Sequence, residues 1–135
     1  MASGLTLKLP VVQDDLDGLK LVKNFPELVE QNIKNLFLTI PGERIMDPTF
    51  GVGLPKYLFQ QNTPAVYAEI RSRADEQVKK YMPFVTINSI TFSSNQIEEP
   101  DGFLANPGIS TNDYFVGMSI NYTIVPIKTT RTMNL

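Results

Sequence analysis

Two carboxylates near the middle of the chain are the residues whose type and spacing come closest to a catalytic pair. Glu43 and Asp47 lie four positions apart in a stretch rich in glycine and proline, and glycoside hydrolysis needs only two acids roughly 5 to 10 Å apart across a cleft. However, Arg44 follows Glu43 directly, and a guanidinium favours the ionised carboxylate, which is the wrong form for a general acid. We therefore predict a structural role in loop hydrogen bonds or an ion pair, with murein hydrolysis through Glu43 or Asp47 as the enzymatic alternative.

Other catalytic machinery is largely missing from the composition. The chain contains no cysteine and no histidine, which excludes disulfides, thiolate nucleophiles, imidazole bases and the usual zinc sites. The pair Gly51 and Gly53 lacks the further glycine and the lysine of a nucleotide-binding loop, so backbone geometry is its expected purpose. We predict a protein that is not an enzyme, with no catalytic residue, no metal and no cofactor.

Charge and length limit the other classes of function. There are 12 Lys and Arg residues against 14 Asp and Glu residues, so no general positive field would attract nucleic acid. No stretch approaches the ~20 apolar residues of a membrane span, and the first ten residues do not resemble an export signal. With 135 residues, 42% hydrophobic and 19% charged, the composition is typical of one soluble globular domain.

Periodicity predicts two main helices that would position the Glu43–Asp47 loop between them. The first begins after Asn24, whose side chain is expected to cap it, and ends at Pro41-Gly42. Thr63 and Pro64 open the second, which Pro83 stops. Both carry an apolar residue every three or four positions. The expected stripes are Val29, Ile33, Leu36, Phe37 and Ile40, then Val66, Ile70, Ala74, Val78 and Met82.

After Phe84 the apolar period changes to two, which predicts strands. A first strand has a phase change that indicates a bulge near Asn88-Ser89, and residues 95–112 read as a long polar loop. Alternation from Tyr114 to Val125 then predicts one strand of about 40 Å, long enough to project beyond its own sheet. The expected fold is α+β: a small antiparallel sheet packed by two main helices. An N-terminal arm, extended or a short strand, covers 1–23, the domain covers 24–128, and a tail covers 129–135.

Residues 36–59, which read LFLTIPGERIMDPTFGVGLPKYLF, form a recognisable pattern. An apolar helix end leads into Gly42-Glu43-Arg44, then Asp47-Pro48, Phe50-Gly51 and Leu58-Phe59, in an order that resembles the gene 25-like baseplate wedge family of contractile-tail phages. Relatives of that family include a baseplate component of type VI secretion systems. The resemblance extends from about Phe25 to Val125.

The resemblance implies a structural subunit that joins a bundle of wedge proteins and templates the first ring of the tail sheath. Its implied partners are other baseplate wedge proteins and the tail sheath protein, with the tail tube as a further candidate. It implies multiple copies around the tail axis, a place in the virion, and assembly in the host cytoplasm. A lysozyme-like hydrolase of the tail and a type VI secretion component are the alternatives.

Partner-binding residues are expected in three places. The motif contributes Glu43, Arg44, Asp47 and Phe50. Family members often carry Glu-Pro-Arg after the long helix, and only the proline matches in Met82-Pro83-Phe84. The resemblance therefore implies either a partner held by apolar contacts at this site or a different partner. Finally, Phe115, Val125 and Ile127 belong to the segment 114–128, which we expect to pair with sheath subunits by strand addition.

Overall fold

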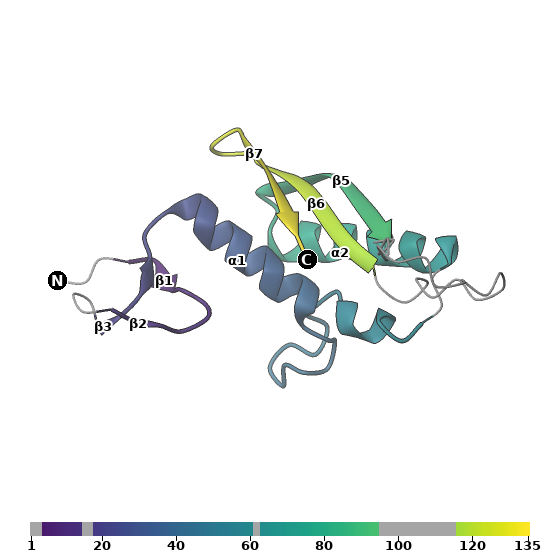
Figure 1. Ribbon diagram of the computed structural model, residues 1–135, viewed down its shortest axis with the longest axis horizontal. Coiled ribbons are helices and arrows are strands. Elements are labelled where there is room, and N and C mark those ends of the chain that lie inside the picture. The colour runs from purple at the N-terminus through teal and green to yellow at the C-terminus, as the bar shows by residue number, and fades with distance from the viewer. Residues whose placement is uncertain (1–3, 15–17, 61–62, 95–115) are drawn as a thin grey trace, which may run out of the picture.

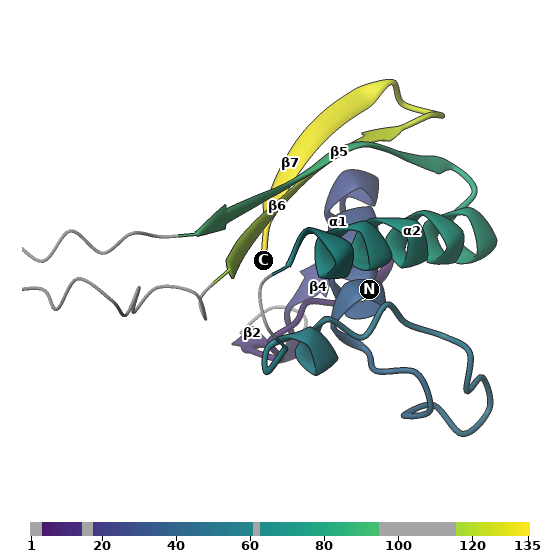
Figure 2. The same cartoon turned by 90° about the vertical axis from the view of Figure 1, so that its right-hand side faces the viewer.

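The computed structural model describes residues 4–14, 18–60, 63–94 and 116–135. Helices α1 (Phe25–Leu38) and α2 (Pro64–Tyr81) lie on one side of a three-stranded sheet of β5 (Val85–Ser94), β6 (Val116–Ile124) and β7 (Thr129–Asn134). A short 3-10 helix, η1 (Leu54–Tyr57), precedes α2. Figures 1 and 2 show that neither helix covers the other face of the sheet. This arrangement confirms the predicted α+β class.

Helix α1 confirms most of the expected pattern. The buried residues of α1 are Val29, Ile33, Leu36 and Phe37, as the spacing predicts. Two details at its ends differ from expectation. Asn24 is the N-cap residue, but its side chain makes no capping hydrogen bond. The helix also ends at Leu38, before Pro41, because Thr39 turns to an extended conformation while its hydroxyl donates to the Asn35 carbonyl at 2.6 Å.

Helix α2 begins as its sequence predicts. Thr63 is the N-cap, and its side-chain oxygen accepts from the Val66 N–H. Ile70, Ala74 and Val78 are buried on the face that packs against the core. Gln77 is a polar residue on this apolar side, where only 5% of it is exposed. Its position matters for the loop described below.

The sheet order is β5-β6-β7, with both neighbours antiparallel. The register shifts between Ile87 and Ser89, which confirms the predicted bulge. Strand β6 alternates as expected, since Met118, Ile120, Tyr122 and Ile124 are buried. However, β6 is the central strand and is paired along both edges. The prediction that segment 114–128 offers its edge to another chain is therefore wrong for β6, whose backbone groups are already used within the sheet.

Residues 129–135 are not a free tail. Residues Thr129–Asn134 form β7, which pairs with β6 after a turn at Val125–Lys128, and Met133 is buried in the core. The chain continues the ladder at Leu135, which exchanges both backbone hydrogen bonds with Met118 at 2.8 and 3.2 Å. A large central cluster of apolar side chains from α1, α2 and all three strands fills the space between helices and sheet.

The N-terminal arm folds back on itself beside the start of α1 (Figure 1). Strand β1 (Thr6–Leu7) pairs with β4 (Leu21–Val22), and β2 (Gln13–Asp14) pairs with β3 (Gly18–Leu19). Gln31 on α1 holds the arm by donating to the Leu7 carbonyl and accepting from the Leu9 N–H, each at 3.0 Å. The arm therefore docks on its own domain, while most of its apolar side chains remain exposed. These are Leu5, Leu7, Leu9, Val11, Val12 and Leu19.

Candidate interaction surfaces

The loop between α1 and η1 is held at its base by backbone hydrogen bonds. The Gly42 N–H donates to the Pro48 carbonyl at 2.9 Å, and the Val52 N–H donates to the Leu36 carbonyl at 2.9 Å. Glu43 accepts from the Ile40 N–H through its carboxylate at 3.0 Å. Glu43 is thus tied into the local hydrogen-bond pattern.

Asp47 and Phe50 connect the loop to the end of α2. Tyr81 donates its hydroxyl to Asp47 Oδ2 at 2.6 Å, and Thr49 donates to Asp47 Oδ1 at 2.9 Å. The Phe50 ring packs edge-on against Tyr81, with centroids 4.8 Å apart, and the Arg44 guanidinium lies 3.6 Å from the Phe50 centroid. The motif residues Glu43, Arg44, Asp47 and Phe50 therefore all serve the loop's own structure.

This geometry argues against Asp47 as an acid catalyst. The hydrogen bond from Tyr81, helped by the one from Thr49, lowers the pKa of the Asp47 carboxyl below its usual value, because hydrogen bonds to the carboxylate favour the charged form. A general acid needs the opposite shift. Among the described residues, no group of three or more acidic side chains is arranged to hold a metal ion.

Two features of this loop do not follow from the sequence pattern. Gln77 accepts from the Gly51 N–H at 2.9 Å, so the polar residue on the apolar side of α2 anchors the loop. A glutamine within an apolar stripe is the signal that could have indicated this role. The loop also presents Ile45 and Met46 to solvent, with 94% and 97% of each exposed. This exposed apolar tip above a hydrogen-bonded base is a candidate contact surface.

The expected partner-binding site at the end of α2 is only partly available. Met82 is 6% exposed and belongs to the core, so it offers almost no surface to a partner. Phe84 is half-buried and its ring lies 6.0 Å from that of Phe25. Pro83 is exposed. Pro83 and the accessible part of Phe84 therefore remain for a partner.

The expected contacts near the last strands have mixed outcomes. Val125 and Ile127 are exposed in the turn between β6 and β7, so both can meet another protein. Phe115 lies outside the described residues.

Neither helix of the described part combines the length and apolar composition that crossing a bilayer requires.

The outer edge of β7 carries unpaired backbone groups. Leu135 and Met118 form a hydrogen-bonded pair, and such pairs alternate with pairs that are not hydrogen-bonded along an antiparallel ladder. By this alternation and the register of β7 on β6, the N–H and C=O groups of Thr130, Thr132 and Asn134 point away from β6. No other strand in the described part of the chain pairs with this edge.

The opposite edge of the sheet is partly covered. By the same alternation Ile90 of β5 points its carbonyl outward, and Arg71 on α2 donates to that oxygen at 3.0 Å. Phe92 on β5 stacks on Tyr67 of α2, with ring centroids 4.4 Å apart. Coverage by a helix and the bulge in β5 both discourage strand pairing there, so β7 offers the accessible edge.

A groove of about 740 Å³ lies beside β7, within the size range of ligand-binding clefts. Residues 131–134 form one wall, α1 forms the floor, and residues 8–10 of the arm form the far wall. The Lys8 ammonium and Glu27 carboxylate are paired at 2.6 Å, and Arg131 and Glu30 at 3.4 Å. The groove therefore combines a free strand edge with a polar floor.

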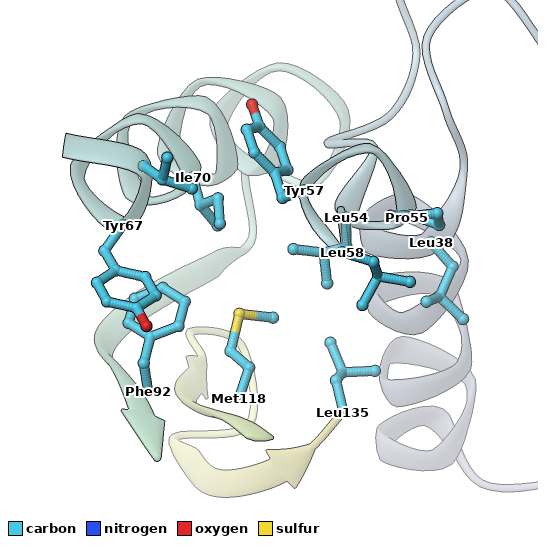
Figure 3. Close-up of a pocket in the computed structure, with 11 residues that line it drawn as sticks. Leu38, Leu54, Pro55, Tyr57, Leu58, Tyr67, Ile70, Phe92, Met118 and Leu135 are labelled. Carbon is cyan, nitrogen blue, oxygen red and sulfur yellow. The ribbon is translucent and has the colours of Figure 1, made fainter. Parts of the chain in front are cut away.

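A separate apolar pocket of about 170 Å³ opens between η1, α2 and the ends of the strands (Figure 3). This volume is close to that of an engineered cavity that holds one benzene ring, so one large side chain fits. Phe59, which follows η1, is 95% exposed. The pocket lining is Leu38, Leu54, Pro55, Tyr57, Leu58, Val66, Tyr67, Ile70, Phe92, Met118 and Leu135.

Comparison with known proteins identifies one family and solved structures with a similar fold. Residues 24–105 match the family model for baseplate wedge protein gp25, which is more than half of the 135 residues. No curated protein sequence matches the chain.

Two similar solved structures share the fold. A chain in the six-fold symmetrised baseplate of the anti-feeding prophage is 22% identical, with a TM-score of 0.66 over 88% of this chain and 83% of that one. A putative tail lysozyme from Geobacter sulfurreducens is 19% identical, with a TM-score of 0.61 over 84% of this chain and 90% of that one.

Proposed function

Because this chain belongs to the baseplate wedge protein gp25 family, we propose that it is a structural subunit of a contractile-tail baseplate that templates the first sheath ring. The template is the free edge of β7, which accepts an extended segment of the tail sheath protein. The strand that pairs with the sheath segment is thus β7 and not β6, and the mechanism is still strand addition.

The single observation that carries the mechanism is the contrast between the two edges of the sheet. The outward groups of β7 have no partner strand in the described part, whereas α2 caps the β5 edge through Arg71. An incoming strand satisfies backbone groups that water otherwise solvates, and it gains a defined register.

Other surfaces suit wedge partners. The apolar loop tip at Ile45 and Met46 and the turn at Val125 and Ile127 are exposed and do not line the β7 groove. They leave the strand edge available while the subunit is held by other wedge proteins, with the tail tube as a further contact. The baseplate of the anti-feeding prophage is six-fold symmetrised, which supports several copies around the tail axis. The proposed location is the tail of a virion, with assembly in the host cytoplasm.

We propose no enzymatic activity for the chain. A similar structure is described as a putative tail lysozyme, so peptidoglycan hydrolysis is the second candidate function. The carboxylate of Asp47 is engaged by Tyr81 and Thr49, which favours a structural role. Purified protein and an Asp47→Asn variant should both show no turnover of peptidoglycan, and turnover that Asp47→Asn abolishes would support the hydrolase instead.

A proline at Thr132 tests the template directly. The Thr132 N–H points away from β6, so Thr132→Pro removes one outward donor without removing a bond of the β6–β7 ladder. Thr132→Ala is the matched control, because it also loses the threonine side chain and keeps the N–H. We expect both variants to fold and only Thr132→Pro to lose sheath nucleation in an assembly assay. Normal sheath growth on Thr132→Pro would contradict the proposed function.

A further inference from the structure

We propose that the sheath segment that pairs with β7 has different side chains on its two faces. Its outer face carries hydroxyl or amide groups, and its inner face carries a carboxylate and an apolar residue. The carboxylate lies beside Arg131 and the apolar residue beside Met133. This inference rests on the proposed function and specifies the chemistry of the partner segment.

The outer face of the sheet is built from continuous rows of small polar side chains. One row joins Thr91, Ser119 and Asn134, another joins Ser89, Asn121 and Thr132, and a third joins Thr86, Thr123 and Thr130. Each row crosses all three strands. The next strand beyond β7 therefore meets a polar residue at every outer position.

Hydrogen bonds between neighbouring strands link these rows. Ser119 donates to Asn134 Oδ1 at 2.8 Å, and the hydroxyls of Thr123 and Thr130 lie 3.0 Å apart. Thr132 donates to Asn121 Oδ1. Hydroxyl and amide groups both donate and accept, so serine, threonine or asparagine opposite β7 can extend each row by one step. A bulky apolar side chain at such a position could not hydrogen-bond to the last polar residue of the row, and it would itself remain exposed to solvent.

Charge on the inner side favours an acidic residue. The cations lining the groove are Lys8, Lys34 and Arg131, and the carboxylates are Glu27 and Glu30. Lys8 pairs with Glu27, and Arg131 with Glu30. Within the described residues Lys34 has no ion pair. A carboxylate on the incoming strand beside Arg131 would balance the groove and face Lys34 across its floor.

One end of the groove is apolar. Met133 on β7 is buried, and both it and the half-exposed Leu38 at the end of α1 line the groove. Inner positions of a strand recur every second residue, so the residue two positions from the one beside Arg131 lies beside Met133. An apolar side chain there continues the inner row of Ile90, Ile120 and Met133.

Synthetic peptides test this inference on the full-length protein. The matched probe is a five-residue peptide with threonine at the first, third and fifth positions and with aspartate and valine at the two positions between them. In one comparison peptide lysine replaces aspartate, and in the other valine replaces every threonine. Binding is measured by amide chemical shifts and by fluorescence anisotropy with the wild type and with Lys34→Glu, an exposed substitution.

We expect the matched peptide to bind at least about tenfold more tightly than either comparison peptide. A loss of this size is typical when a favourable charge interaction or a set of hydrogen bonds is removed from an interface. Lys34→Glu should reduce the difference in affinity between the aspartate peptide and the lysine peptide. Equal affinity for all three peptides, or failure of the matched peptide to bind, overturns the inference. The Thr132→Pro assembly assay separately decides whether β7 is the template.

Discussion

At the scale of single residues, Asp47 stabilises the fold through its charged form. The hydrogen bond from Tyr81 lowers its pKa from the ordinary value of 3.8, so the folded state prefers the carboxylate. A depressed folded pKa contributes stability above the unfolded pKa, and this contribution is lost as the pH falls through the folded value.

Asp47→Asn should therefore be less stable than the wild type at pH 7, and the difference should shrink as the pH falls below 3.8. Urea unfolding of both proteins at pH 7 and in acid measures this. A difference independent of pH would show that the Asp47 charge has no role, and Glu43→Gln provides a comparison in the same loop.

Tyr122 has an unusual environment for a hydroxyl group. Its side chain is fully buried, and its hydroxyl has no hydrogen-bond partner among the described residues. Burial also raises the pKa of this phenol. A buried polar group without a partner lowers stability.

Removing the Tyr122 hydroxyl should therefore stabilise the protein. We expect Tyr122→Phe to increase the free energy of unfolding by about 1 kcal/mol, whereas Tyr122→Ala should reduce it by about 3 to 5 kcal/mol through the cavity it leaves. Chemical denaturation measures both. A less stable phenylalanine variant would indicate that the hydroxyl is satisfied in solution.

Two glycines in the motif loop differ in what surrounds them. Gly51 has a φ of +111°, and a Cβ there would lie 2.2 Å from the Thr39 carbonyl oxygen, whereas Gly42 has a φ of +97° and open space around its Cα. Gly51→Ala should therefore reduce stability by about 3 kcal/mol or more, and Gly42→Ala by only about 1 to 2 kcal/mol. Thermal unfolding measures both, and equal losses would contradict the close approach of Gly51 to Thr39.

At the scale of elements, the sequence predicts whatever has a strong local pattern. Both helices, the Thr63 cap, the bulge in β5 and the alternation of β6 follow from spacing alone. Strand β7 does not, because Met133 is its only buried residue and its other side chains are threonine, arginine and asparagine. Its outer face is polar and one edge is open, so little apolar periodicity remains to be seen.

The candidate site was also predictable only in part. The motif identified the loop, but which side chains hold its base depends on distant residues such as Gln77 and Tyr81. Met82 continued the apolar stripe of α2, and its burial follows from that stripe more directly than the partner contact suggested by its position before Pro83. Pairing between distant strands decided the rest, since β6 became central only because β7 returns beside it.

At the scale of the whole molecule, different parts of the surface are available for different contacts. The sheet has one face covered by helices and one face of hydroxyl and amide groups, while the motif loop lies away from the β7 edge (Figures 1 and 2). Such a subunit can be fixed by wedge partners on one side and still offer backbone groups on another.

Electron cryo-microscopy of an assembled tail with its first sheath ring tests the central claim most directly. We predict a fourth strand beside β7, contributed by the sheath protein and bonded to the backbone of Thr130, Thr132 and Asn134. A β7 edge that faces solvent in the assembled tail, or a sheath strand paired with β5 instead, would contradict the account.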